Sequence, residues 1–220
     1  MKHYKLTDET LRLYNGTTLY RIELTIDCVH GEKGDRGGFI EKESNLSDNA
    51  WVSDNAQVSG NAWVSDNALV SGNALVYGYA WVSGYAWVSG DAQVSDNAWV
   101  SDNARVSGNA RVYGNARVSG YASVSDNALV SGYARVYGDA QVSDNAWEKS
   151  PLQIQGSKHF LSECKKGFLK IGCYEKSFNY WKKNFRKIGE REGYTDEQIK
   201  EYGLYIDLAI KLKNNSNGNI

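Results

Sequence analysis

A six-residue phrase repeats without insertion or deletion from Leu46 to Trp147, and this period constrains the fold more than any other feature. The consensus unit is Ala-x-Val-Ser-(Asp/Gly)-Asn. Every sixth residue from Ala50 to Ala146 is alanine, and every sixth residue from Val52 to Val142 is valine. A strict short period is typical of a solenoid, in which each repeat packs only against its neighbours. The chain is therefore expected to fold mainly as a repetitive β body between two non-repetitive ends.

Within one unit, alanine and valine lie two residues apart, so both side chains point inward from an extended segment while x and serine point outward. The Asp/Gly-Asn pair is expected to form a corner, because glycine and asparagine tolerate the left-handed backbone region. Three such sides make a coil of eighteen residues, and each valine stacks on the valine one coil away. The seventeen units of residues 46–147 predict between five and six coils, spaced by about 4.8 Å.

The valine and alanine registers resemble those of the hexapeptide-repeat family, the left-handed parallel β-helix, and the resemblance implies the hand of the coil. The N-terminal segment, from YKLTDET to GDRGGFIEKESNLSDNAWV, more narrowly resembles the YdcK-type β-helix proteins of phages and prophages. The three scattered cysteines, Cys28, Cys164 and Cys173, are expected to be free thiols in a reducing cytoplasm, here that of a bacterial host cell. Hexapeptide acyltransferases carry a catalytic histidine, but this repeat contains no histidine, cysteine or insertion. We therefore expect a protein that is not an enzyme, with acyl transfer as the enzymatic alternative.

Residues 1–39 are predicted to form a cap over the first coil, whose open end would otherwise expose unpaired backbone. Asn15-Gly16 lies between two segments rich in β-formers, LRLY and TTLYRIELTI, and favours a hairpin with a type I′ turn. The glycine-rich loop Gly31–Gly38 lacks the Gly-Lys-Ser/Thr ending of a phosphate loop. It is interpreted as a tight, exposed connection into the solenoid.

The solenoid itself is expected over residues 40–156. Ile40 lies six positions before Leu46 and is therefore in phase with the valine register. Leu152 and Ile154 still fall in the alanine and valine phases, which predicts a last partial coil.

Residues 157–220 are predicted to form a small α+β domain that ends in two helices. Lys165-Lys166-Gly167 marks the turn of a hairpin. Ser177 is placed to cap a first helix, and Thr195–Gln198 reads as the capping box of a second.

Charge and cysteine content exclude several classes of protein. The net charge is −1, so no specific nucleic-acid binding is expected, although residues 148–220 hold 14 basic and 9 acidic side chains. The three cysteines form no CxxC pair, and the aspartates of the repeat sit singly at corners, so we expect neither a metal nor a cofactor. No apolar run approaches the ~20 residues of a membrane helix, and the polar N-terminus does not predict a signal peptide.

The first candidate binding surface is a row of outward side chains on one face of the solenoid. An eighteen-residue coil aligns five x positions, namely Trp63, Trp81, Trp99, Arg117 and Arg135. Exposed apolar rows of this kind are uncommon on monomers. We expect the row to be a subunit contact in a homo-oligomer, a dimer or a trimer. The alternatives are a docking surface for a ring-bearing ligand, a sugar or a partner, protection of an exposed sheet face by flat aromatic rings, and simple drift after repeat duplication.

The second candidate lies at the start of the C-terminal domain, in Ser157, Lys158 and His159 with Lys165 and Lys166. A short Gly-Ser turn beside lysines is able to hold a phosphate, which suggests a nucleotide-type small molecule. The alternative interpretation is a glycine turn with solvated lysines. Cys173, next to a glycine, is the candidate nucleophile if its thiol were activated.

These features together predict a non-enzymatic binding or scaffold protein that self-assembles. The alternative function is a phage counter-defence protein that sequesters a nucleotide immune signal, an expectation that rests on the phage resemblance alone.

Overall fold

The computed structural model describes residues 2–216, which divide into two compact units. One unit comprises residues 2–139 with 143–150, and the other comprises residues 140–142 with 151–216. The first contains the N-terminal strands and the solenoid apart from residues 140–142, and the second contains those residues and a four-stranded sheet with two helices. No helix among residues 2–216 is long and apolar enough to cross a membrane.

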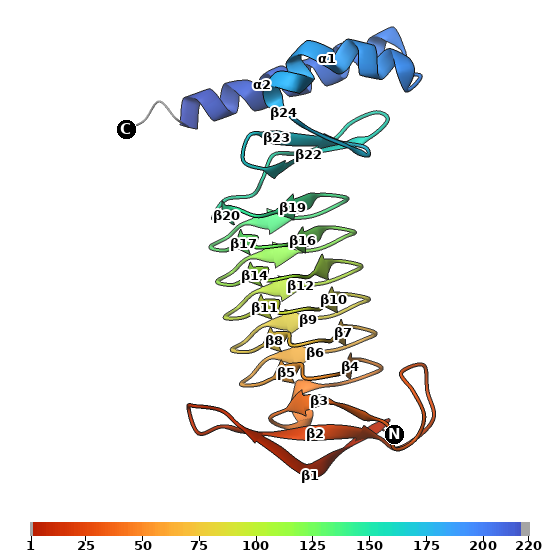
Figure 1. The fold of residues 1–220 in the computed structure, drawn as a ribbon, viewed down its shortest axis with the longest axis vertical. Helices are drawn as coiled ribbons and strands as arrows, with labels where there is room; N and C mark the ends of the chain where they lie inside the picture. Colours follow the sequence, from red (N-terminus) through yellow and green to blue (C-terminus); the bar gives the residue numbers. More distant parts are fainter. Residues whose placement is uncertain (1, 217–220) are drawn as a thin grey trace. The chain divides into compact units, whose positions relative to one another are not determined.

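The repeat forms a parallel β-solenoid of three sheets, as predicted, with coils stacked in sequence order (Figure 1). The first face holds β4 (Trp51–Val52), β7 (Leu69–Val70), β10 (Trp87–Val88), β13 (Arg105–Val106), β16 (Ser123–Ser125) and β19 (Gln141–Ser143). The second holds β5 (Gln57–Val58), β8 (Leu75–Val76), β11 (Gln93–Val94), β14 (Arg111–Val112), β17 (Leu129–Val130) and β20 (Ala146–Trp147). The third holds β6 (Trp63–Val64), β9 (Trp81–Val82), β12 (Trp99–Val100), β15 (Arg117–Val118) and β18 (Arg135–Val136).

The interior of the solenoid is built from the two registers identified in the sequence. Val70 pairs with Val88 and Val88 with Val106, an offset of one eighteen-residue coil. Every repeat valine from Val52 to Val142 and every repeat alanine from Ala50 to Ala140 is at most 1% exposed. Small and branched side chains thus fill a narrow interior without polar groups, as the period-two spacing of alanine and valine predicts.

The corners differ from expectation in one detail. The left-handed backbone is adopted by the Asp/Gly position, with φ between 48 and 59° for the aspartates, and the following asparagine is left-handed only at Asn145. The aspartates compensate for this backbone cost by accepting backbone N–H groups of the next coil. Asp54 Oδ2 accepts from the N–H of Gly72 at 2.8 Å, and Asp102 Oδ2 from that of Gly120 at 2.9 Å. These bonds join the corners of neighbouring coils, eighteen residues apart.

The N-terminal cap is the predicted hairpin plus a third strand that continues into the solenoid. Strands β1 (Tyr4–Arg12) and β2 (Thr18–Leu24) pair antiparallel, β2 pairs with β3 (Arg36–Ile40), and a 3₁₀ turn, η1 (Glu43–Asn45), follows. β3 also pairs parallel with β5, through Phe39 with Gln57 and Ile40 with Val58. The strand that ends the cap is thus the first strand of the second solenoid face, which leaves no open edge between them.

The expected type I′ turn of the cap is wrong, and the exposed connection expected at Gly31–Gly38 is found only as far as Arg36. Asn15 does not adopt a positive φ, whereas Gly16 does (87°), and the N–H of Leu13 donates to Thr17 O at 2.9 Å. This is a three-residue hairpin loop with glycine at the left-handed position, and not a type I′ turn. The last two glycines of the loop, Gly37 and Gly38, are buried in β3. They lie so close to the adjacent coil that a Cβ at either position would be 2.5 or 2.6 Å from a backbone oxygen of that coil.

The last coil is one residue short, and this reverses the expected orientation of its side chains. Leu129 pairs with Ala146 and Val130 pairs with Trp147, whereas the repeat predicts an offset of eighteen. Trp147, expected to point outward, is therefore buried, and Ala146, expected inside, is exposed. A one-residue slip moves every side chain of a strand to its other face. The large indole closes the interior that smaller valines fill elsewhere.

The second unit contains four antiparallel strands and two helices: β21 (Gln153–Gln155), β22 (Phe160–Lys165), β23 (Phe168–Ile171), β24 (Tyr174–Ser177), α1 (Phe178–Arg191) and α2 (Asp196–Ser216). The expectation of a last partial coil is wrong, because Ile154 pairs antiparallel with Leu161 of β22. Apolar phase alone does not distinguish a coil from a hairpin strand.

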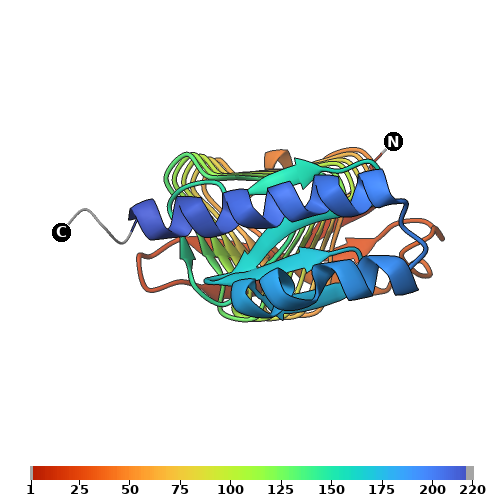
Figure 2. The same cartoon turned by 90° about the horizontal axis from the view of Figure 1, so that it is seen from above.

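The predicted helix starts are confirmed. Ser177 Oγ accepts the N–H of Tyr180, and Thr195 and Gln198 exchange hydrogen bonds of 3.0 and 3.2 Å. Both helices lie over one face of the sheet (Figure 2), and their shared core includes Leu161, Leu169, Trp181 and Ile206.

Candidate functional site

The tryptophans of the predicted row form a stacked ladder on the third face of the solenoid. The rings of Trp63 and Trp81 have centroids 5.1 Å apart at 17°, and those of Trp81 and Trp99 are 4.7 Å apart at 5°. Arg117 continues the row with its guanidinium 5.0 Å from the Trp99 ring, and Arg135 pairs with Arg117. The predicted alignment of the five residues is therefore confirmed.

The stacking limits what the ladder is able to bind. Both faces of the Trp81 ring are covered, one by Trp63 and the other by Trp99. The indole N–H groups of Trp63 and Trp81 donate to Ser47 Oγ at 2.8 Å and Ser65 Oγ at 3.3 Å. A base or sugar needs an open aromatic face to stack on. The middle of the ladder therefore offers a ligand only ring edges, and the geometry favours a role in covering the sheet.

Three arginines of the solenoid lie in one coil, one on each face. Arg105, Arg111 and Arg117 are all exposed, and none of them forms an ion pair within residues 2–216. Arg105 lies 5.7 Å from the ring of Trp87, a weaker copy of the Arg117–Trp99 contact. The aspartates that could neutralise these cations are instead turned toward the backbone at the corners.

The donors of the Gly-Ser turn are occupied by groups of the same unit. The N–H of Ser157 donates to Glu201 Oε1 at 2.8 Å, and its hydroxyl donates to the same carboxylate. Lys158 Nζ donates to the carbonyl oxygens of Glu192 and Gly193 at 2.8 and 2.7 Å, beyond the last turn of α1. A cation at this place stabilises the end of a helix. These residues fasten the β21–β22 turn to the helices, and a carboxylate stands where a phosphate was expected.

The structure does not bring Lys165 and Lys166 together with that turn. His159 directly precedes β22, whereas Lys165 and Lys166 lie at the opposite end of that strand. Lys165 forms an ion pair with Glu175 at 2.7 Å and lies 4.8 Å from the ring of Phe168, while Lys166 is exposed.

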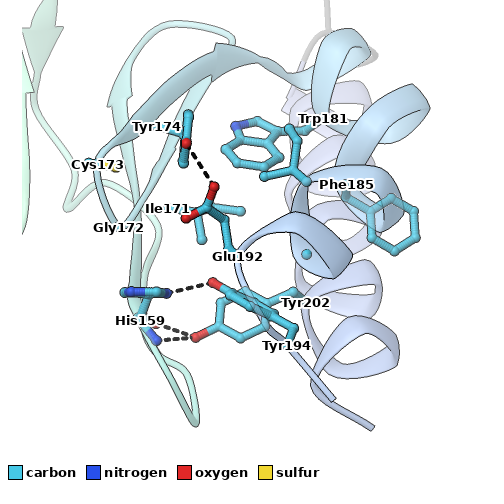
Figure 3. A pocket seen from close by; sticks show the side chains of 12 residues that line it. His159, Ile171, Gly172, Cys173, Tyr174, Trp181, Phe185, Glu192, Tyr194 and Tyr202 are labelled. Atoms are coloured by element: carbon cyan, nitrogen blue, oxygen red, sulfur yellow. Dashed lines mark hydrogen bonds between the residues drawn. The ribbon is translucent and has the colours of Figure 1, made fainter. Parts of the chain in front are cut away.

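A small pocket of about 60 Å³ lies between strands β22 to β24 and the helices of the second unit (Figure 3). Its lining residues are His159, Ile171, Gly172, Cys173, Tyr174, Trp181, Phe185, Ile188, Gly189, Glu192, Tyr194 and Tyr202. Of these, the sequence singled out only His159 and Cys173. The aromatic residues come from a strand, two helices and a loop, so no regular spacing in the sequence connects them.

His159 is fixed by two tyrosines. Tyr202 Oη lies against both the N–H and the carbonyl oxygen of His159, donating to the latter at 2.6 Å, and Tyr194 Oη lies 2.6 Å from Nδ1. Burial raises the pKa of the Tyr194 hydroxyl, so this group keeps its proton at neutral pH. In the tautomer whose Nδ1 accepts from this hydroxyl, the imidazole carries its proton on Nε2. Gly172 (φ 56°) permits the packing, because a Cβ there would lie 3.1 Å from the ring of His159.

Glu192 places a partly open carboxylate in the same pocket. Its Oε1 accepts from Tyr174 Oη at 2.9 Å and from Arg191 Nε at 3.2 Å. The hydrogen bond from Tyr174, followed by that from Arg191, lowers the pKa of Glu192, so the carboxylate is charged at neutral pH. Oε2 receives no hydrogen bond from any group of residues 2–216. Figure 3 shows this side chain turned from the end of α1 toward Tyr174.

Neither a Cys-His pair nor a metal site is formed within the described chain. Cys173 is exposed at the pocket, but no hydrogen bond joins its Sγ to His159 among residues 2–216. The same residues contain no group of three or more His, Cys, Asp or Glu side chains that could hold a metal ion.

The three parallel sheets and the eighteen-residue coil define a β-solenoid protein. A family model, the YdcK beta solenoid repeat, matches the coils in overlapping segments at residues 56–72, 68–84, 92–108, 98–112, 104–120, 110–125 and 122–138. Over these segments the solenoid of this chain is similar to the YdcK beta solenoid repeat, as its resemblance predicted. No curated protein matches the chain.

Proposed function

We propose that this chain is a non-enzymatic binding protein whose C-terminal unit holds a flat ring group that carries an N–H donor. The observation that carries the proposal is the open Oε2 of Glu192, a charged oxygen in a pocket whose other walls are mainly aromatic. The Glu192 side chain is 35% exposed and its charge pairs with Arg191, so Oε2 is open to accept a further hydrogen bond from a ligand.

The walls favour a planar ligand. Tyr174, Trp181, Phe185 and Tyr194 line the pocket, and flat aromatic groups bury well among such side chains. His159 adds a second polar contact, because its Nε2 has no hydrogen-bond partner among the described residues. A ligand that donates to Glu192 and accepts from His159 would satisfy both groups, as an amino-substituted heterocycle does.

This pattern also supports the alternative function, the sequestering of a nucleotide signal, in a restricted form. The base of a nucleotide would enter the pocket, with its amino group toward Glu192. The donors of Ser157 and Lys158 already have partners, so they give no support to a phosphate site at that turn. The phosphates would then extend toward solvent.

A non-enzymatic role is supported by how the titratable groups are used. The thiol of Cys173 has no base within hydrogen-bonding distance among the described residues, so no activated nucleophile is formed at the pocket. Acyl transfer would instead give acetyl-CoA turnover that falls when His159 is changed.

Calorimetry on the full chain tests the proposal with four probes: adenosine, guanosine, tryptamine, and choline as a cation without N–H donors. We expect heat of binding from at least one of the three ring probes and a loss of about tenfold or more in affinity for Glu192→Gln. Glu190→Gln, on the exposed side of α1, is the matched control and should leave the affinity unchanged. Binding that ignores Glu192→Gln, or no binding of any ring probe, would reject the proposal.

A further inference from the structure

Helix α2 carries apolar side chains on two opposite faces. Ile199, Tyr202, Ile206 and Ala209 are buried against the rest of the second unit. On the other side, Leu204, Leu208 and Leu212 are 70%, 43% and 47% exposed. A single exposed leucine is ordinary, but three leucines at i, i+4 and i+8 form a continuous ridge on a helix. Ridges of this kind are the surfaces on which helices pack together.

Charged residues flank the ridge in a self-complementary order. Glu201, Leu204, Leu208 and Lys211 follow one another at spacings of three, four and three, which is the spacing of a helix-packing seam. Read backwards, the order is base, leucine, leucine, acid. A second α2 running antiparallel therefore places Leu208 of the partner subunit on Leu204, and Lys211 of the partner subunit on Glu201. A parallel partner would instead place like charges opposite each other.

We propose that this protein forms a two-fold homodimer in which the outer faces of two α2 helices pack antiparallel. The surface meets itself across a two-fold axis, so each Glu201–Lys211 contact occurs twice, as in any isologous interface. Glu201 is held in place before association, because its carboxylate accepts from Ser157 and from Tyr205 Oη at 3.0 Å. Lys211 is exposed and forms no ion pair within residues 2–216. This dimer is independent of the ligand pocket.

Analytical ultracentrifugation of the full chain, from about 2 to about 200 µM, tests the dimer. We expect a concentration-dependent species of twice the 24.5 kDa chain mass. Leu204→Glu should abolish it, since a charge would stand at the centre of the seam, while circular dichroism stays unchanged. A monomeric wild type over this range overturns the proposal. So does a dimer that survives Leu204→Glu but is lost on Trp81→Ala, because the ladder would then be the interface.

The antiparallel register has its own test. Glu201→Lys alone and Lys211→Glu alone should each weaken the dimer by about tenfold, since like charges then face each other. Mixing the two variants should restore it, because each lysine meets a glutamate in the mixed dimer. Lys187→Glu, exposed on α1, is the control and should leave the dimer unchanged. Two weakened variants that stay weak on mixing overturn the register.

Discussion

Trp147 pairs with Val130, seventeen residues earlier, whereas Val130 itself pairs with Val112, eighteen residues earlier. The slip turns the indole into the interior at the last coil, where no further valine follows. Its Nε1 has no hydrogen-bond partner among the described residues, so the indole acts there through its bulk.

Removing that indole should open the end of the solenoid. Trp147→Ala is expected to lower the free energy of unfolding by about 3–5 kcal/mol, the usual cost of deleting a buried tryptophan. Trp87→Ala is the matched control, because Trp87 is outward and exposed, and it should cost about 1 kcal/mol. Denaturant unfolding followed by circular dichroism measures both. Equal losses would show that Trp147 does not close the coil.

The ladder should be most sensitive at its middle rung. Trp81 stacks on two rings and Trp63 on one, so Trp81→Ala should cost about 2 kcal/mol and Trp63→Ala roughly half as much. Trp81→Phe keeps an aromatic face and should recover part of the loss. Thermal unfolding of the three variants gives the comparison. The reverse order would argue against stacking as the source of stability.

The corner aspartates combine a left-handed backbone with a hydrogen bond between coils. Asp66 has φ 58° and accepts from the N–H of Gly84 at 3.0 Å. Asp66→Asn keeps both properties and should be nearly neutral, whereas Asp66→Ala should cost about 1–2 kcal/mol. Asp66→Gly should fall between them, because glycine loses the acceptor but relieves the backbone. A larger free energy of unfolding for Asp66→Ala than for Asp66→Gly would contradict this account.

His3 should make the solenoid cap sensitive to acid. Burial, followed by the nearby His30, lowers the pKa of His3 below its ordinary value of 6.5. Below pH 6.5 the unfolded chain therefore binds a proton at His3 more readily than the folded chain does. The contribution of neutral His3 to the free energy of unfolding is complete above pH 6.5 and is lost as the pH falls below that value. Melting temperatures from pH 8 to pH 5 should fall less steeply for His3→Phe than for the wild type. Parallel curves would assign the acid sensitivity to other groups.

The sequence predicts the solenoid well because its interior depends on a local rule. Alanine and valine two apart face the same way, and their unbroken register leaves one way to bury both. The one-residue shift at Trp147 cannot be predicted from this register, because the sequence itself continues without interruption. The shift arises in the backbone, where Asn145 adopts a left-handed conformation directly after Asp144. The last coil has no successor whose pairing would hold it in phase.

The pocket could not be predicted in the same way. Tyr174, Glu192 and Tyr202 meet only because a strand, a helix end and a second helix converge, and no spacing along the chain records that meeting. Ser157 and Lys158 were recognised by residue type, yet residue type does not show that Glu201 and the end of α1 already engage them. Tertiary partners decide whether a polar turn is open to a ligand.

Because eighteen residues close one coil, only some changes in the number of repeats leave the faces of the solenoid intact. Near-identical repeats promote slippage during replication, and a slip of one six-residue unit keeps the alanine–valine interior intact. Between Trp99 and Arg117 such a change would nevertheless carry every later outward residue to the next face and separate these two side chains. A slip of three units preserves every face and adds one rung. Inherited length variants with an intact ladder should therefore differ by whole coils.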